Sequence, residues 1–575
     1  MSAEMASVQQ FDVEFPTVIE ACPIKIDSFL QEQLVCLYFY LTRAKGDKKL
    51  SVLREKLGNV LDIFKQNLGS NPDIIVYFKL FYRMIGQTRD LLYGKGEHDL
   101  TYMMLWEWYK RYPTLAVYAT YRLVLDGFGS WRDIKYLCHY LRSYGGAKSD
   151  GFIDICVSLM NQQLRTDLET WKFSINARSR NHISNVAKWI PREYKKFGWL
   201  YELLAMDWAK TEFPYIMATT HCSYDSFLAA KSKCKRLYRK QISLLNKALD
   251  TTQIKQCSRQ REAIIPANVS TRTLMTQPGL VFSDDICSHN FKKYFDKKFS
   301  DFDTGKVGSG SPTIFPTLVY FVKTALMILK DDSPNDYRLD LLDKQWKVLS
   351  KSISNKKLEN LLPILDMSYS IQKDDAASLY TAIGLAILIA ERSTFGKRVL
   401  VIDHTPTWVN LEECPTFFSM VTELYSATEE SRFTIPDFNK GIDMIMIAIA
   451  SYNIDDPNRS KHLIKDIENL RLVIFSNFDG FIENDNRRFV GASGTSHSQF
   501  ILWNVGKQNI EDIRLPGTIH QTNLIFMSGS SPRLIRDISH KRDYTTTPYR
   551  MVCSILNSDR YSCFEDYIDR VIESV

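Results

Sequence analysis

Three oxygen-bearing side chains, Asp366, Ser368 and Ser370, alternate directly after the apolar stretch 361-LLPIL-365. Carboxylate and hydroxyl oxygens are ligands that small hard cations such as Mg²⁺ and Mn²⁺ prefer in proteins. Aspartate and serine are also common in turns and at helix N-caps. The pattern therefore fits either the start of a metal-binding loop or a polar turn between two buried elements.

Basic residues gather in two parts of the chain, and such cations can neutralise nucleic-acid phosphates. The denser group lies in 231-KSKCKRLYRK-240 and comprises Lys231, Lys233, Lys235, Arg236, Arg239 and Lys240. The second group is interleaved with Trp189 and Tyr194 and comprises Arg178, Arg180, Lys188, Arg192, Lys195 and Lys196. Aromatic rings can stack on unpaired bases, so RNA contact is one interpretation of these groups. A solvated helix face is the other.

The sequence lacks the motifs of common enzyme chemistries. It contains no G-x-S-x-G, no H-E-x-x-H and no Walker loop. Asp403 and His404 form a polar pair after a predicted strand, and we interpret them as loop residues. The eleven cysteines include no C-x-x-C pair and are expected to be reduced thiols. We therefore expect a protein that is not an enzyme.

The composition is that of an ordinary globular protein. The chain has 575 residues, of which 45% are hydrophobic and 24% charged, which is enough for two or more domains with cores. Its formal net charge of +7 permits an anionic partner without requiring one. The first residues, MSAEMASVQQFDVEFP, have no sustained apolar run, and no apolar stretch reaches the roughly 20 residues of a membrane span. We expect a soluble, cytoplasmic protein without a membrane span.

The hydrophobic pattern divides the chain into a tail, residues 1–24, and two regions. From 25 to 345, apolar and aromatic residues recur at helical spacing, with short polar joints between the helices. This arrangement predicts HEAT-like stacked helical pairs, in a ring or an open solenoid. From 346 to 575 strands and helices alternate, which predicts a doubly wound, Rossmann-like α/β domain. The expected fold class is thus α plus α/β.

The strands predicted for the second region are short apolar runs, at 361–365, 398–403, 471–476, 499–505 and 523–529. The predicted helices lie between them, at 376–391, 413–427, 437–451 and 459–468. Continuous apolar runs are typical of strands that are covered on both faces. Doubly wound sheets bind ligands at the carboxyl ends of their strands, and Asp366 is at such an end.

Several segments resemble those of one protein family. The most specific is 187-AKWIPRE-193, and others are 127-GFGSWRDIKYLCHYL-141, 238-YRKQISLLNKALD-250, 261-REAIIPANVSTRTLM-275 and 523-NLIFMSGSSPRLIRDI-538. They are similar to segments of proteins that join a TROVE-like helical region to a carboxy-terminal von Willebrand factor A domain. That group occurs in plants, fungi and large DNA viruses and is distantly related to the Ro ribonucleoprotein. The resemblance covers residues 75–570 and implies RNA binding by the helical region.

The resemblance also implies a role for the polar residues after 361–365. In von Willebrand A domains the corresponding aspartate and two serines bind a metal ion, and the open metal position takes a carboxylate from a partner. Asp366, Ser368 and Ser370 match this half of the site.

The other half of the implied metal site departs from the family pattern. A threonine from a second loop is expected where this chain has Pro436, and Thr434 lies two residues earlier. An aspartate is expected after strand 4 where this chain has Asn477, and Asp479 lies two residues later. Mg²⁺ prefers near-octahedral oxygen geometry, so we expect this degenerate site to bind Mg²⁺ weakly. Alternatively, the serines cap the following helix and Asp366 accepts backbone hydrogen bonds.

Two functions follow as hypotheses. The first is a non-enzymatic RNA-binding or ribonucleoprotein scaffold, whose von Willebrand A domain recruits a protein partner. The second is a protein-interaction or structural component, virus-encoded and located in the virion. Salt-sensitive RNA affinity would favour the first hypothesis, and a partner retained after nuclease and EDTA treatment would favour the second.

Overall fold

The described residues form helices up to residue 353, and strands together with further helices after it. The computed structural model of the protein describes residues 23–43, 47–177, 183–218, 224–269, 273–274, 277–283, 285–303, 317–330, 336–353, 358, 360–367, 376–430, 437–451, 470–478, 499–506, 513, 515–539 and 546–568. This arrangement confirms the predicted class, α plus α/β. The calls that fall on Arg178, Arg180, Ser368, Ser370, Thr434, Pro436, Asp479 and the predicted helix 459–468 lie outside the described residues.

The first half of the chain forms a succession of helices joined by short connections. The longer ones are α1 (Pro23–Tyr40), α2 (Asp47–Asn67), α3 (Ile75–Arg89), α4 (Asp99–Arg111), α5 (Pro113–Leu125), α6 (Trp131–Tyr144) and α7 (Asp150–Ala177). They are followed by α8 (Val186–Trp189), α9 (Gly198–Glu212), α10 (Pro214–Ala218), α11 (Tyr224–Ala248), α12 (Thr252–Cys257), α14 (Gly279–Phe282), α15 (Ile286–Asp303), α16 (Leu318–Leu329) and α17 (Asp336–Ile353). Local signals set several boundaries. Pro113 starts α5, where its missing N–H costs no helical hydrogen bond.

The second half contains one six-stranded mixed sheet. Its strands are β1 (Leu361–Asp366), β2 (Arg398–Ile402), β3 (Thr407–Asn410), β4 (Arg471–Ser476), β5 (Gln499–Asn504) and β6 (Leu524–Ser528), in the order β3-β2-β1-β4-β5-β6. All neighbours are parallel except β3, which pairs with β2 antiparallel. The five predicted strands are present, and β3 is an additional edge strand that the hydrophobic pattern did not indicate.

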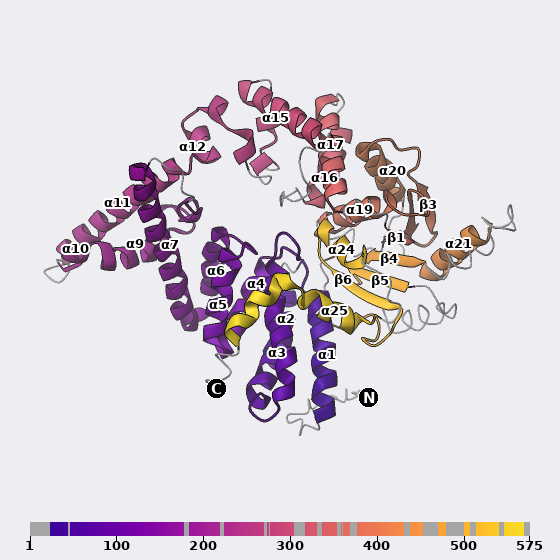
Figure 1. The fold of residues 1–575 in the computed structure, drawn as a ribbon, viewed down its shortest axis with the longest axis horizontal. Helices are drawn as coiled ribbons and strands as arrows, with labels where there is room; N and C mark the ends of the chain where they lie inside the picture. Colours follow the sequence, from indigo (N-terminus) through magenta and orange to yellow (C-terminus); the bar gives the residue numbers. More distant parts are fainter. Residues whose placement is uncertain are drawn as a thin grey trace, which may run out of the picture.

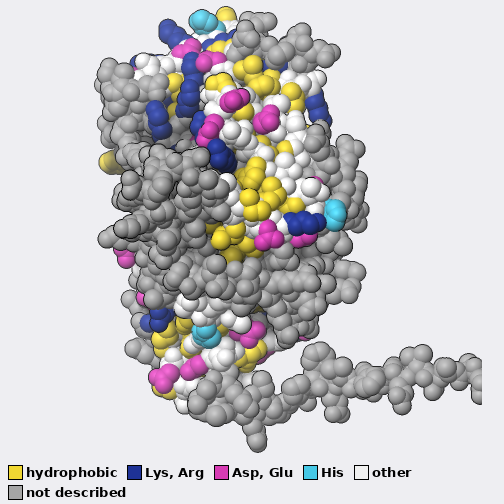
Figure 2. Space-filling model, turned by 90° about the vertical axis from the view of Figure 1, so that its right-hand side faces the viewer, with side chains coloured by type: hydrophobic (Ala, Val, Ile, Leu, Met, Phe, Trp, Pro, Cys, Tyr) yellow, Lys and Arg dark blue, Asp and Glu magenta, His cyan; other side chains and the backbone are white. Residues whose placement is uncertain are grey.

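The helices of this half are α19 (Ala377–Ala390), α20 (Phe417–Glu430), α21 (Phe438–Ser451), α24 (Ile535–Ser539) and α25 (Pro548–Leu556), followed by the 3₁₀ segment η7 (Asp559–Tyr567). Helices α19, α20 and α21 correspond to three of the predicted helices. Figure 2 shows the side of the molecule on the right of Figure 1, where hydrophobic, acidic and basic side chains are intermingled.

The sheet is covered on both faces, as its apolar strands predicted. Alternate residues such as Leu365 and Val401 pack on one face in a core that includes α16, α17, α19 and α20. The intervening residues, such as Ile364, pack on the other face. That second core is continuous with the core of α1 to α9, and Phe39 lies 5.0 Å from Phe526 between ring centroids. The helical region and the sheet thus share one hydrophobic core.

The described carboxy-terminal elements α25 and η7 pack against the amino-terminal helices, so the described elements follow a closed circuit (Figure 1). The yellow carboxy-terminal segment lies across the indigo amino-terminal helices in Figure 1, and η7 packs against α3 and α5. Phe564 contacts Tyr82 with ring centroids 5.5 Å apart. A Cβ on Gly86 would lie 2.5 Å from the Phe564 ring, so this close approach requires glycine. Among the described residues no helix is both long and apolar enough for a transmembrane span.

Candidate nucleic-acid interface and strand-end site

The carboxyl ends of β1 and β4 lie side by side at the point where the strand order changes direction. The chain passes from β1 to β2 on one side, whereas β4 pairs with β1 on the other. Asp366 ends β1, and Ser476 ends β4. The Ser476 hydroxyl donates a hydrogen bond to Oδ2 of Asp366, and the backbone N–H of Phe478 donates to the Ser476 oxygen over 2.9 Å. The strand-end position predicted for Asp366 is therefore correct.

Asn477 also lies at this strand end, one residue beyond Ser476, and both side chains are buried. A Cβ on Gly506 would be 2.1 Å from the Asn477 Cβ, so the loop after β5 packs tightly over it. Among the residues that the structure describes, no three His, Cys, Asp or Glu side chains are grouped so as to hold a metal ion. The oxygen donors described at this strand end are the Asp366 carboxylate, the Asn477 amide and the Ser476 hydroxyl, which is already bonded to Asp366, and alone they do not fit Mg²⁺.

Asp403 and His404 lie in the connection between β2 and β3, as predicted for loop residues. Oδ1 of Asp403 accepts a hydrogen bond from the backbone N–H of Thr405 over 2.7 Å, which closes a local turn. His404 is exposed. Asp403 therefore has a structural role in this turn.

Helix α11 carries the denser basic group, and acidic neighbours neutralise part of it. Lys231 and Lys235 pair with Glu202, at 3.8 Å for Lys235. Glu193 accepts a bond from Arg239 over 2.6 Å. The remaining cations of this group, Lys233, Arg236 and Lys240, are exposed. Among the described residues none of these three cations forms an ion pair, so they retain their positive charge in the predicted RNA-binding group on α11.

The second basic group lies beside α6. Arg192, Lys195 and Lys196 are exposed, and Lys188 is half-buried with its ammonium 5.8 Å from the centroid of its neighbour Trp189. This group meets a stripe of α6 residues that the sequence interpretation did not single out. Together they form what we call the cation–aromatic cluster: Arg132, Lys135, Tyr136, His139, Arg142, Lys188, Trp189, Lys196, Phe197 and Trp199.

Lys135 is at the centre of the cation–aromatic cluster. Its Nζ lies 5.1 Å from the ring centroid of Tyr136, 5.0 Å from that of Trp189 and 5.2 Å from that of Phe197. About two helical turns further along α6, the Arg142 guanidinium lies 4.5 Å from the centroid of the Trp199 ring. Cations and ring faces attract each other at such distances. The cluster thus presents positive charge and flat aromatic surface on one face.

Within the described part of the chain, none of the five Lys and Arg residues of this cluster forms an ion pair. Burial lowers the pKa of Lys135, and the charge of Arg132 lowers it further. Burial also lowers the pKa of Lys188. His139 has a lowered pKa because of burial first, and then because of the charges of nearby Lys196 and Arg142. The cluster therefore crowds like charges together, and an anion placed there would relieve their repulsion.

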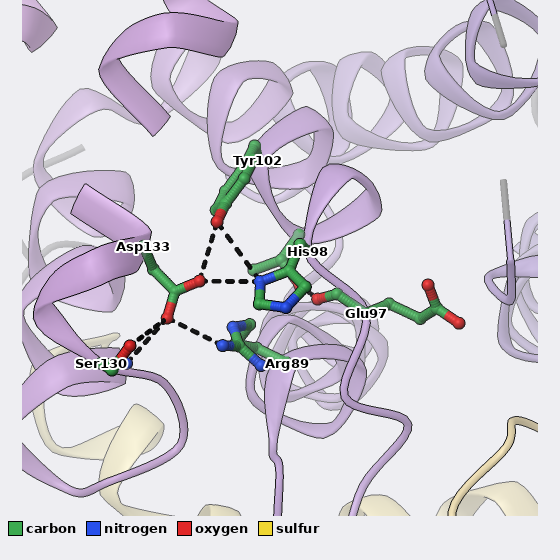
Figure 3. A network of polar contacts seen from close by, with 7 residues as sticks. Arg89, Glu97, His98, Tyr102, Ser130 and Asp133 are labelled. Atoms are coloured by element: carbon green, nitrogen blue, oxygen red, sulfur yellow. Dashed lines mark hydrogen bonds and ion pairs between the residues drawn. The ribbon is translucent and has the colours of Figure 1, made fainter. Parts of the chain in front are cut away.

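A buried polar network holds the start of α6 and so positions the cluster. In Figure 3 Arg89, His98, Tyr102 and Ser130 surround the carboxylate of Asp133. Arg89 Nη2 lies 2.8 Å from Oδ2, His98 Nδ1 2.9 Å from Oδ1, and the Tyr102 hydroxyl donates to Oδ1 over 2.7 Å. The backbone N–H of Ser130 donates to Oδ2 over 2.7 Å, which forms a capping box.

The charge state of Asp133 follows from this network. Burial opposes its ionisation, but the hydrogen bond from His98 and the charge of Arg89 outweigh burial and hold its pKa well below the usual range. The carboxylate is therefore ionised and fully bonded. The hydrogen bonds of Asp133 fix the first turn of α6. Arg132 of the cluster is the residue directly before Asp133, so this turn also positions Arg132.

Sequence reasoning missed the α6 part of the cluster because it searched for dense basic runs. Arg132, Lys135, His139 and Arg142 are three or four residues apart, which places them on one helix face. A search for cations at helical spacing, next to the aromatic segment 189–199, would have found this face. In comparisons with known proteins, no protein-family model and no curated protein matches the chain.

Proposed function

We propose that the protein is a non-enzymatic RNA-binding scaffold whose helical region contacts RNA through the cation–aromatic cluster. The observation that carries this proposal is the combination of uncompensated cations and half-buried rings on one face. Phosphates bind the cations, and the rings offer stacking surface for unpaired bases. Exposed Lys233, Arg236 and Lys240 on α11 extend the positive charge available to a polyanion.

Single-stranded RNA is the preferred form in this proposal. Bases within a duplex are already stacked on one another, whereas unpaired bases can stack on Trp189 or Phe197. Stacking of this kind contributes about 1–3 kcal/mol per base. Backbone contacts alone would not distinguish the two forms.

The experiment compares fluorescence anisotropy of labelled single-stranded and duplex RNA of equal length with the wild type and the Trp189→Leu variant. The variant keeps an apolar side chain but loses the indole. We expect weaker single-strand binding and nearly unchanged duplex binding. An equal loss of affinity for single-stranded and duplex RNA would mean that Trp189 stabilises the fold and does not stack on bases. Absence of RNA binding by the wild type at low salt would refute the proposal.

We further propose that the protein belongs to the TROVE-like and von Willebrand A group that its segments resemble, with its α/β domain recruiting a protein. The strand order, the antiparallel edge strand β3 and the position of Asp366 at the end of β1 support this assignment. The order alone is common to other doubly wound sheets. HEAT-like stacking of α1 to α11 is the corresponding proposal for the helical region.

One observation favours the second candidate function, a protein-interaction or structural component, cytoplasmic or part of a virion. The described strand end supplies one carboxylate, already bonded to Ser476, so a partner bound there would not depend on a cation. Affinity purification with nuclease and with EDTA tests it. A stoichiometric partner that stays bound after both treatments supports this function. Loss of the partner after nuclease treatment would mean that RNA mediates the interaction.

A further inference from the structure

His139 is the histidine of the cation–aromatic cluster, and the charge of a histidine ordinarily changes between pH 5 and 8. It lies on α6, four residues after Lys135 and three before Arg142, so the three side chains share one helix face. Its ring meets Phe197 edge to face, with the centroids 5.2 Å apart and an interplanar angle of 78°. The Lys135 ammonium lies 5.2 Å from the centroid of the same Phe197 ring. The imidazole is thus placed among the cations and rings of the proposed RNA interface.

The His139 ring has no polar partner within the described part of the chain. Its backbone carbonyl accepts a hydrogen bond from the Ser143 hydroxyl over 2.9 Å, but the two ring nitrogens form no hydrogen bond and no ion pair there. The side chain is half-buried, so solvent reaches it. His98 differs, because its Nδ1 lies 2.9 Å from the Asp133 carboxylate in the buried network. Of these two histidines, His139 is therefore the one whose ring can serve a ligand.

Charged neighbours from three parts of the fold act on the His139 ring. Burial lowers its pKa first, and the charges of Lys196, between α8 and α9, and of Arg142, on α6, lower it further. Asp99 at the start of α4 opposes this shift with its negative charge. Lys135, one turn away on α6, adds a further positive charge to the same face. The ring is therefore neutral at pH 7.5, and a negatively charged ligand placed there would favour its protonated form.

We propose that the protonated His139 ring binds an RNA phosphate, so that the cluster takes up a proton when RNA binds. This inference rests on the RNA contact proposed above and adds a residue and a pH dependence to it. An imidazolium donates from both ring nitrogens, and its charge-assisted bonds to phosphate are roughly twice as strong as neutral hydrogen bonds. The phosphate also compensates the neighbouring cations that disfavour protonation of the free protein. RNA affinity should therefore rise as the pH falls.

The size of the effect follows from the linkage between proton and RNA binding. The pKa of His139 is higher in the complex than in the free protein, so the complex binds more protons and acid favours it. A pKa that is one unit higher in the complex corresponds to about tenfold tighter RNA binding at a pH below both values. We expect single-stranded RNA to bind about threefold to tenfold more tightly at pH 5.5 than at pH 7.5.

Fluorescence anisotropy at pH 5.5 and pH 7.5 and constant ionic strength measures this ratio of affinities. The probe is a labelled oligouridylate, whose bases do not titrate in this range. His139→Gln keeps a polar side chain but cannot take up the proton, so its ratio should fall to nearly one. His289→Gln, an exposed histidine of α15, is the matched control and should keep the wild-type ratio. Lys293→Gln/Lys297→Gln, which removes two exposed charges from the same helix, should keep it as well.

Proton uptake can also be measured directly. Calorimetric titration with the oligouridylate at pH 6, in two buffers with different protonation enthalpies, gives the number of protons taken up per RNA bound. The wild type should take up a fraction of one proton, and His139→Gln should take up less. His139→Arg carries a permanent charge, so it should bind the RNA more tightly than the wild type at pH 7.5 and lose the pH dependence.

The outcomes separate this inference from the proposed function. Absence of oligouridylate binding by the wild type at both pH values would refute the RNA contact and, with it, the role of His139. Binding with equal affinity at both pH values, or a pH dependence that His139→Gln leaves intact, would overturn the proton coupling while the RNA contact stands. If His139→Gln does not fold, as its melting temperature would show, His139→Arg and the proton uptake of the wild type decide the question.

Discussion

The hydroxyl of Ser528 donates a hydrogen bond to the carbonyl oxygen of Tyr38 over 2.8 Å, across 490 residues of sequence. Asn504 Nδ2 makes the equivalent bond to the carbonyl of Phe39 over 3.0 Å. Two strand ends thus satisfy carbonyl groups in the last turn of α1, which have no partner within their own helix. Lys95 Nζ completes this arrangement with a bond to the Leu41 carbonyl over 3.2 Å. The sheet and the first helix are joined by polar contacts as well as by their shared core.

Asn504→Ala should destabilise the closed circuit. The substitution leaves the buried carbonyl of Phe39 without this donor, which costs about 1–3 kcal/mol. Urea unfolding followed by circular dichroism measures the change. Ser426→Ala, an exposed substitution on α20, is the matched control and should be neutral. Equal stability of wild type and Asn504→Ala would show that the contact contributes nothing to closure.

Asp133→Asn should be strongly destabilising at neutral pH. The ion pair with Arg89 is buried on both sides, and loss of one partner from a buried pair costs about 3–5 kcal/mol. Chemical unfolding at pH 7 measures this loss. Ser130→Ala, which removes one weaker bond of the same network, should cost less. A variant as stable as the wild type would contradict the assigned charge of Asp133.

The pH dependence of Asp133 has a defined sign. Its pKa is lower in the folded state, so the unfolded state binds more protons in acid and the stabilisation is lost as pH falls below the ordinary value of 3.8. The stability difference between wild type and Asp133→Asn should therefore shrink from pH 5 downwards. A difference that grows in acid would be incompatible with a depressed pKa.

Asp537 should show the opposite sign. Burial raises its pKa from 3.8 to about 7 although the charge of Arg536 opposes the shift, so the folded state binds the proton more tightly. Its contribution is fully present below pH 4 and is lost as pH rises towards 7. Asp537→Asn should be more stable than wild type at pH 8 and equal to it at pH 4. Melting temperatures across this range provide the measurement, and an Asn variant that is less stable at pH 8 would refute the shift.

Mg²⁺ should have little effect on the fold. The described part of the strand-end site offers a single carboxylate, Asp366, whose Oδ2 already accepts a bond from Ser476. We expect equal melting temperatures in Mg²⁺ and in EDTA at matched ionic strength. A saturable rise with Mg²⁺ that Asp366→Asn abolishes would establish a metal site.

The strands that could be predicted from the sequence are those formed by a continuous run of apolar residues. Strands such as 471–476 and 499–504 are buried along their whole length, so a short apolar run identifies them. Strand β3 was missed because it lies at the sheet edge, where Thr407 and Asn410 are exposed and only Val409 is buried. An edge strand does not need an apolar run.

Closure of the chain could not be predicted in the same way. Besides apolar packing, it includes hydrogen bonds from Asn504 and Ser528, two ordinary polar residues whose partners are backbone carbonyls far away in sequence. The metal-site residues illustrate a different limit. The motif placed Asp366 at a strand end correctly, but its bond to Ser476 is a tertiary contact that no spacing rule contains.

The most direct test of the central claim is the salt dependence of single-stranded RNA binding by Lys135→Gln/Arg142→Gln. Each lost phosphate contact reduces the slope of log affinity against log salt by about 0.7 for single strands. We predict a slope smaller than that of the wild type by about 1.4, whereas Lys293→Gln/Lys297→Gln, with the same change in net charge, keeps the wild-type slope. Identical slopes for the two double variants, or no RNA binding by the wild type at low salt, would contradict the proposal that the cation–aromatic cluster is the RNA interface.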